Sequence, residues 1–177
     1  YNYFIEKQIS CSYFIPLRGE GYGLNTERIK KIKKEINPSL IITVDCGISA
    51  TAQVEECKKE GIDIIITDHH EQPEKLPDTL IFNPKTDRNK GLFCEYCGAG
   101  VVFKLIEALE GKEYSEKFAD IAAIATIGDI VPLKGENRNI VRCVLDIINK
   151  REKSVYKIFY DKLNLKKNFS SADIAFK

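Results

Sequence analysis

Three consecutive residues, Asp68-His69-His70, are the part of this 177-residue sequence best suited to chemistry. The two histidines are the only ones in the chain, and they stand side by side behind a carboxylate. Imidazole nitrogens bind metals or carry protons near neutral pH, and a neighbouring carboxylate can bind a metal or orient a ligating histidine. A lone histidine usually has no such role, but this pairing is an uncommon coincidence. We therefore expect a catalytic or metal-binding site here.

Two further aspartates follow apolar segments in the same way. Asp45 comes directly after Leu40–Val44, and Asp129 follows Ile121–Ile127 across Gly128. A single aspartate in such a place is by default a turn former or a helix cap. Joined with Asp68-His69-His70, they would supply three carboxylates and two imidazoles to one site. Such ligands suit Mn²⁺ or Mg²⁺ better than zinc, and paired ions of this kind drive in-line attack on phosphorus.

The elements that must position these residues are predicted to alternate between strands and helices. Parallel strands joined by helices bring their carboxyl ends to one edge of a sheet, where ligands bind. Strands are predicted at Cys11–Pro16, Leu40–Val44, Ile62–Thr67 and Leu80–Phe82, the second and third buried on both faces. Helices are predicted at 2–8, 26–36 with Asn25 as cap, 49–59 with Ser49 as cap, 99–109, 115–127, 138–150 and 155–163.

Composition limits the class of protein. The net charge of +1 gives no general reason to expect nucleic-acid binding, which would need a local basic surface. No apolar run approaches the ~18 residues that a membrane helix needs. The six cysteines are scattered, and Cys94 and Cys97 lack a second pair, so a zinc site is not favoured. Reduced cysteines and the absence of a membrane segment predict a cytoplasmic protein.

The motifs resemble those of the DHH phosphoesterase superfamily. Asp68-His69-His70 is flanked by Val44-Asp45-Cys46-Gly47-Ile48 upstream and Gly128-Asp129-Ile130-Val131-Pro132-Leu133 downstream, as in that superfamily. Gly21-Tyr22-Gly23 and several other segments, in the expected order, are similar to the RecJ single-stranded-DNA exonucleases. The resemblance implies an α/β fold with a mostly parallel sheet flanked by helices. It also implies a DHH domain over 1–150 and a helical connector over 151–177 toward a second domain.

The resemblance implies a role for each matching acid and histidine. Asp45 would bridge two metal ions, and His69 and Asp129 would bind metal. Asp68 would bind metal or support another ligand, and His70 would contact the substrate phosphate. Further metal-binding aspartates would lie before Tyr1, so the 177 residues alone are expected to be inactive or weakly active.

Other matching positions would contact the substrate. Arg18 suits the gripping of a terminal phosphate, and Tyr22 the stacking of a base. Gly98 and Gly100 would allow the backbone to approach either the substrate or a neighbouring helix, and the sequence favours neither of these interpretations over the other. The basic residues near the C-terminus are predicted to contact the phosphates of the DNA backbone; they are Lys150, Arg151, Lys153, Lys166 and Lys167. For the neighbouring Tyr156 and Tyr160, packing in a core is favoured over stacking on bases.

The implied activity is metal-dependent removal of mononucleotides from single-stranded DNA in the 5′→3′ direction, in DNA repair and recombination. The cofactor would be Mn²⁺ or Mg²⁺ in a two-metal site. Expected partners are single-stranded DNA, a single-strand-binding protein and a helicase, with the protein itself a monomer. One alternative is a DHH phosphodiesterase for short oligonucleotides or cyclic dinucleotides, which Gly21-Tyr22-Gly23 argues against. Another is a non-catalytic replication scaffold, which the retained acids and histidines argue against.

Overall fold

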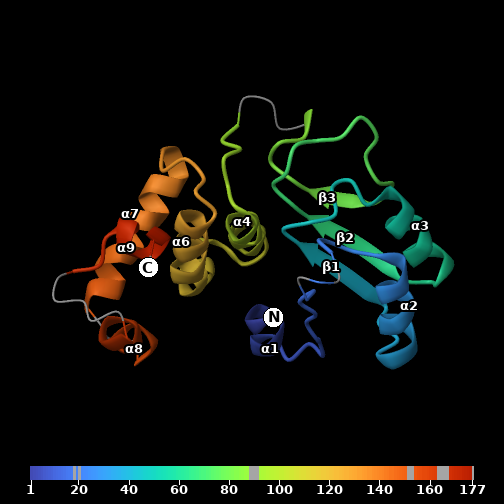
Figure 1. Ribbon diagram of the computed structural model, residues 1–177, viewed down its shortest axis with the longest axis horizontal. Helices are drawn as coiled ribbons and strands as arrows, with labels where there is room; N and C mark the ends of the chain where they lie inside the picture. Colours follow the sequence, from blue (N-terminus) through green and yellow to red (C-terminus); the bar gives the residue numbers. More distant parts are fainter. Residues whose placement is uncertain (18, 20, 88–91, 151–153, 163–167, 177) are drawn as a thin grey trace.

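A three-stranded parallel sheet of order β1-β2-β3 forms one side of the protein, at the right in Figure 1. The strands are β1 (Leu40–Val44), β2 (Asp63–Thr67) and β3 (Leu80–Phe82). The computed structural model describes residues 1–177 apart from 18, 20, 88–91, 151–153, 163–167 and 177. Because all three strands run in one direction, their carboxyl ends meet at one edge. The predicted α/β class and the three central strands are confirmed.

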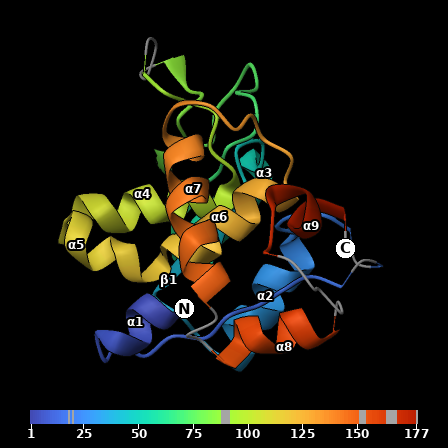
Figure 2. The same ribbon diagram turned by 90° about the vertical axis from the view of Figure 1, so that its left-hand side faces the viewer.

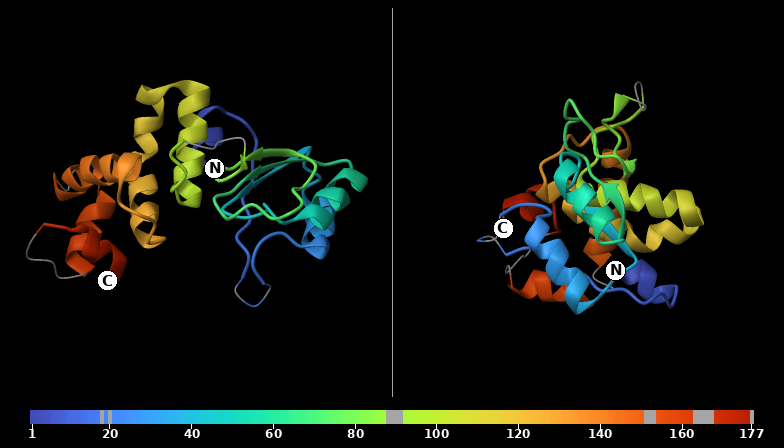
Figure 3. Two further views of the ribbon diagram at one scale, coloured as in Figure 1. Left: turned by 90° about the horizontal axis from the view of Figure 1, so that it is seen from above. Right: turned by 90° about the vertical axis from the view of Figure 1, so that its right-hand side faces the viewer.

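Two helices cover one face of the sheet, as the view from the right-hand side in Figure 3 shows. They are α2 (Thr26–Glu35) and α3 (Thr51–Lys59). Ile29, Val54 and Ile66 are fully buried in the core between these helices and β2. The predicted cap of α2 is confirmed, since Asn25 accepts a hydrogen bond from the backbone N–H of Arg28 at 2.8 Å. The predicted Ser49 cap is wrong: α3 starts after Ala50, without a side-chain cap.

β1 is less buried than its composition predicts. Leu40 is 42% exposed and Val44 51% exposed, because β1 pairs with β2 alone among the described residues. Continuous burial was expected from the apolar run, but an edge strand has a neighbour on one side only. The strand predicted at Cys11–Pro16 is wrong. This segment forms no strand, and its Tyr13 and Ile15 side chains lie exposed.

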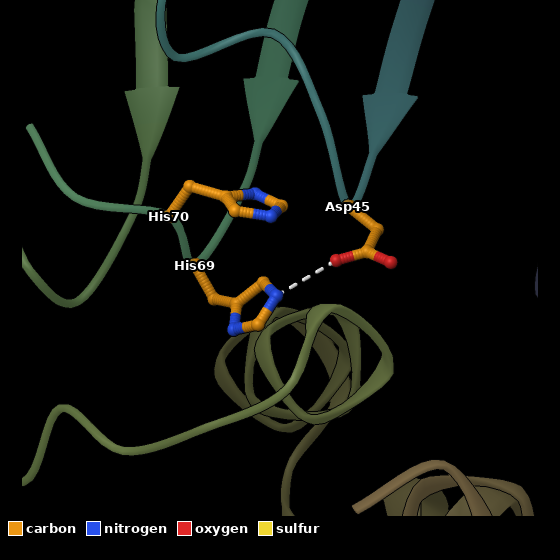
Figure 4. A group of neighbouring side chains, drawn as sticks. All are labelled: Asp45, His69 and His70. Carbon is orange, nitrogen blue, oxygen red and sulfur yellow. Dashed lines mark ion pairs between the residues drawn. The ribbon is translucent and has the colours of Figure 1, made fainter. Parts of the chain in front are cut away.

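The remaining helices continue away from the sheet (Figures 1 and 2). The first of the larger ones, α4, has its N-terminus at the carboxyl ends of the strands (Figure 4). Further along, a second core joins α6 and α7 to the segment that follows them, including the buried Tyr156 and Tyr160. Core packing of these two tyrosines is thus confirmed, while the division at residue 150 stays a prediction. The helices are α1 (Asn2–Glu6), α4 (Gly98–Glu110), α5 (Lys112–Ser115), the 3-10 helix Glu116–Phe118, α6 (Ala119–Gly128), α7 (Gly135–Lys150), α8 (Ser154–Lys162) and α9 (Ser171–Phe176).

Within the described ranges, none of these helices combines the length and the apolar character that crossing a bilayer requires.

Candidate metal centre

Asp45 is the first residue after β1, and a tight turn directs its carboxylate across the strand ends. Its backbone lies in the left-handed region, with φ of 64°, which aspartate tolerates better than most residues. Its N–H still donates to the carbonyl of Thr67 at 3.0 Å, so the turn stays fixed to β2. The Asp45 Oδ1 atom lies 2.9 Å from Nε2 of His69 (Figure 4). The two strand ends therefore bring a carboxylate and an imidazole together.

Asp129 joins this pair from a different part of the fold. It directly follows α6, and its Oδ2 lies 3.5 Å from the same Nε2 of His69. Potential ligand atoms of Asp45, His69 and His70 also all lie within 4.8 Å of one another. The convergence expected from the sequence is thus observed: Asp45, His69, His70 and Asp129 gather at the carboxyl edge of the sheet.

Asp68 lies beneath this group and serves as an acceptor for the surrounding backbone. It is 1% exposed. Its Oδ2 accepts from the N–H of Ile48 at 2.9 Å, and its Oδ1 accepts from the N–H of His69 at 2.8 Å and from Nδ1 of His70 at 2.7 Å. Burial alone would raise the pKa of Asp68, but these hydrogen bonds together hold it below its ordinary value. Since both oxygens are occupied, the geometry favours a supporting role for Asp68 over metal binding.

His70 is oriented from two sides. Its Nδ1 carries the proton that Asp68 accepts, because a carboxylate cannot donate, and this leaves Nε2 free of the proton in the neutral ring. Asn83, buried directly after β3, donates to the backbone carbonyl of His70 at 3.0 Å. The His70 side chain is 47% exposed, so its free nitrogen can reach a metal or a substrate phosphate.

Of the two glycines in question, Gly98 is the one at the site. A Cβ on Gly98 would lie 2.4 Å from Oδ1 of Asp45, so only glycine lets the start of α4 approach this carboxylate. A Cβ on Gly100 would instead lie 3.3 Å from Tyr96, which comes just before the start of the same helix. Gly98 therefore allows the backbone to approach a functional group, the Asp45 carboxylate. Gly100 allows only local packing at the start of the helix. Cys97 caps α4, its sulfur accepting from the N–H of Gly100 at 3.3 Å.

Tyr22 stands at the rim of the site. Its hydroxyl donates to the backbone carbonyl of Asp45, and its ring meets the His70 ring edge-on with 5.9 Å between centroids. Burial of the hydroxyl and the Asp45 charge raise the pKa of Tyr22 to about 12, so the phenol keeps the proton that it donates. The residue is nevertheless 76% exposed, which leaves a ring face available to a base. Arg18, the predicted phosphate anchor, lies outside the described residues, as do Arg151, Lys153, Lys166 and Lys167.

Sequence reasoning missed one residue that supports the centre, Asn137 in α7. It is fully buried, and its Nδ2 donates to the carbonyls of Glu95 at 2.6 Å and Pro132 at 3.1 Å. Glu95 precedes the start of α4 that meets Asp45, and Pro132 belongs to the loop that follows Asp129. Asn137 therefore links the two segments that flank the site. Its position inside a polar Glu-Asn-Arg sequence gave no signal of burial.

The group of ligand atoms fits a divalent cation. Burial raises the pKa of Asp45, and Asp129 raises it further, while His69 acts in the opposite direction. Asp45 Oδ1 is buried without an aligned hydrogen bond, despite its close approach to His69. The Asp45 and Asp129 carboxylates repel one another, and a cation bound between them would relieve that repulsion. Mixed oxygen and nitrogen donors of this kind suit Mn²⁺.

Comparison with known proteins agrees with this architecture. Residues 1–126 match the DHH family, N-terminal domain. The chain belongs to the DHH family. Among its DHH relatives is the single-stranded-DNA-specific exonuclease RecJ of Bacillus subtilis, 47% identical over 136 residues that make up 76% of this chain. RecJ of Thermus thermophilus is 38% identical over 133 residues, 73% of this chain.

Solved DHH structures match the fold as well. A crystal structure of exonuclease RecJ bound to manganese superposes with a TM-score of 0.77 and 32% identity, covering 92% of this chain and 42% of that one. RecJ from Thermus thermophilus in complex with Mn²⁺ gives a TM-score of 0.71 at 30% identity, covering 86% of this chain and 23% of that one. The chain spans only 17% and 19% of the two curated relatives named above.

Proposed function

We propose that this chain forms the catalytic core of a metal-dependent exonuclease that degrades single-stranded DNA in the 5′→3′ direction to mononucleotides, in DNA repair and recombination. The observation that carries the proposal is the convergence of Asp45 and Asp129 on Nε2 of His69, at the strand ends of a DHH domain. Related proteins that share this domain are RecJ exonucleases, and two of their structures hold manganese.

Each residue has a part in the proposed reaction. Asp45, His69 and Asp129 would hold Mn²⁺ or Mg²⁺, with Asp45 between two ions. When bound, such ions supply Lewis acidity toward the phosphoryl oxygens and the attacking water. His70, held by Asp68, would direct Nε2 at the phosphate, and Tyr22 would stack on a base beside it. Single-strand-binding protein and a helicase remain proposed partners of the monomeric, cytoplasmic full-length protein.

The test uses the full-length protein and long single-stranded DNA labelled at one end. We expect Asp45→Asn and His69→Ala to lower the Mn²⁺-dependent rate about a thousandfold, a loss typical when a group that stabilises transition-state charge is removed. Asp63→Asn is the matched control, because Asp63 is an exposed acid at the opposite end of β2. A 5′ label should appear as mononucleotide at once, and a 3′ label only at the end of the reaction.

The alternatives predict different results. A phosphodiesterase for short substrates would cleave dinucleotides and leave long strands intact. A non-catalytic scaffold would show no Mn²⁺ binding by calorimetry. Wild-type rates in Asp45→Asn or His69→Ala would refute the assignment of the site.

A further inference from the structure

A hollow separate from the metal centre is lined by residues of α7, of the loop before it and of the start of α9. Figure 2 shows α7 and α9 on the side that faces the viewer. Its volume is about 480 Å³, within the range of small-molecule binding sites. Apolar side chains such as Leu133, Leu145 and Phe169 line part of it, and polar side chains, among them Arg138 and Arg142, line the rest. It lies outside residues 1–126, which match the DHH family.

The two arginines of the hollow form no ion pair with any described residue. Arg138 and Arg142 are exposed, one turn apart on α7, and neither has a carboxylate within 4 Å in the part of the chain that the structure describes. The other described arginine, Arg28, is already engaged: it donates to the carbonyl of Gly23 at 3.0 Å and lies over the Phe14 ring. Asp146 is the only acid among the described residues lining the hollow. Two free guanidinium forks therefore face one cavity, a geometry suited to phosphate oxygens.

The apolar wall of the hollow is held rigidly. Asn149 accepts from the N–H of Phe169 at 2.7 Å and donates to its carbonyl at 3.1 Å. The Tyr160 ring packs edge-on against the Phe169 ring, with 4.7 Å between centroids. Phe169 is consequently fixed in place before any ligand arrives. Guanidinium groups beside a fixed apolar wall match a nucleotide, which has a charged phosphate at one end and a base with an apolar ring face at the other.

The hollow is within reach of the metal centre. It begins at Leu133, four residues after Asp129, a separation of at most about 14 Å along an extended chain. A strand whose end lies at Asp129 would thus extend into the hollow within a few nucleotides.

We propose that the hollow binds nucleotides of single-stranded DNA downstream of the cleaved bond, with Arg138 and Arg142 each contacting a phosphodiester. The inference rests on the proposed exonuclease function and adds to it a second site that grips the substrate away from the chemistry. Dinucleotides would be too short to occupy this site.

Binding is measured first, without catalysis. Full-length protein in EDTA is titrated into labelled oligothymidylate of about 20 nucleotides, long enough for an extended single-strand site. The double variant Arg138→Gln/Arg142→Gln should bind about a hundredfold more weakly, since a hydrogen bond to a charged group is worth about tenfold or more. The slope of log Kd against log salt should fall by about 1.4, or 0.7 for each lost phosphate contact. Lys31→Gln/Lys34→Gln, which removes the same charge from the exposed face of α2, should leave both values unchanged.

Hydrolysis is measured second, with Mn²⁺. The arginine variant should show a raised KM for the long substrate and wild-type cleavage of a 5′-phosphorylated dinucleotide. Arg138→Lys/Arg142→Lys should keep the salt slope and lose affinity, because the charge remains and the fork does not. Thermal melts verify that the variants are folded.

Three results would overturn the inference. Unchanged Kd and salt slope in the arginine double variant would show that no phosphate binds there. An equal loss on dinucleotide and long strand would place the effect at the metal centre or the fold. A changed sedimentation coefficient with unchanged DNA binding would make the hollow a protein interface. Failure of the exonuclease function itself would appear separately, as wild-type protein that binds DNA in EDTA and cleaves none in Mn²⁺.

Discussion

A Cβ atom on Gly98 would lie 2.4 Å from the Asp45 carboxylate, well inside van der Waals contact. The start of α4 therefore fixes where this carboxylate can lie. The backbone of Gly98 is an ordinary helical one, so alanine would fit the helix and conflict only with Asp45.

We predict that Gly98→Ala displaces the Asp45 carboxylate and weakens Mn²⁺ binding by tenfold or more, with little change in thermal stability. Isothermal calorimetry on the full-length protein measures the affinity. Gly100→Ala is the control, because its Cβ would lie 3.3 Å from Tyr96 and 3.6 Å from the Cys97 sulfur, with no contact to Asp45. If Gly98→Ala binds Mn²⁺ as the wild type does, the contact does not position Asp45.

The raised pKa of Asp45 leads to a second prediction, on stability without metal. A carboxylate whose pKa is higher in the folded state favours the unfolded state once it ionises. In the metal-free protein, the contribution of Asp45 to stability should therefore fall as the pH rises from the ordinary carboxyl pKa of about 4 through the raised one. Asp45→Asn should melt at a higher temperature than the wild type at pH 7 in EDTA, and the difference should shrink toward pH 4.

The same variant should show no stabilisation by Mn²⁺, whereas the wild type should gain stability as the ion is added. Melting curves recorded with EDTA and with Mn²⁺ provide both comparisons. If metal-free Asp45→Asn is less stable than the wild type at pH 7, the ionised Asp45 carboxylate does not destabilise the metal-free fold.

Tyr22 has an exposed ring and a bonded hydroxyl, and two variants separate their roles. Tyr22→Ala removes a stacking surface, for which alanine substitution typically costs about 1–3 kcal/mol per base, so KM for single-stranded DNA should rise about 5- to 150-fold. Tyr22→Phe keeps the ring and loses the bond to the Asp45 carbonyl. It should retain most of the affinity. Equal losses in both variants would assign the effect to the hydroxyl.

Asn137 is expected to support the centre through the backbone. Asn137→Ala leaves the carbonyls of Glu95 and Pro132 without this buried donor, at a cost of about 1–3 kcal/mol for a group left unsatisfied. Urea denaturation should show the loss, and Mn²⁺ affinity should fall as the Asp129 loop loosens. Asn139→Ala, on an exposed position two residues further along α7, should change neither. Wild-type Mn²⁺ affinity in a destabilised Asn137→Ala protein would limit Asn137 to a role in folding.

Part of the site was predictable from the sequence because its ligands follow strands. Asp45 and His69 lie at the ends of apolar runs, and parallel pairing brings such ends together. The roles of Gly98 and Gly100 could not be separated in this way, since the difference between them is a contact across the fold. Asn137 was missed for a similar reason: burial of a polar side chain depends on carbonyls about 5 and 42 residues away, which no local pattern reveals.

The two errors in the predicted strands share one physical cause. The apolar composition of Leu40–Val44 and of Cys11–Pro16 indicates a preference for extended structure, which becomes a buried strand only with neighbours on both sides. β1 has one such neighbour, and Cys11–Pro16 has none among the described residues. The local sequence favours an extended backbone in both segments, but pairing with neighbouring strands determines whether that backbone becomes a buried strand.

The unpaired edge of β1 affects the solubility of the purified 177-residue chain. Backbone N–H and C=O groups along an open edge, flanked by the exposed Leu40 and Val44, form a template on which another copy can add a strand. Purified alone at high concentration, the chain is therefore expected to self-associate and lose solubility through this edge. A lysine in place of Leu40 would be the first change to make when preparing it for crystallisation or NMR.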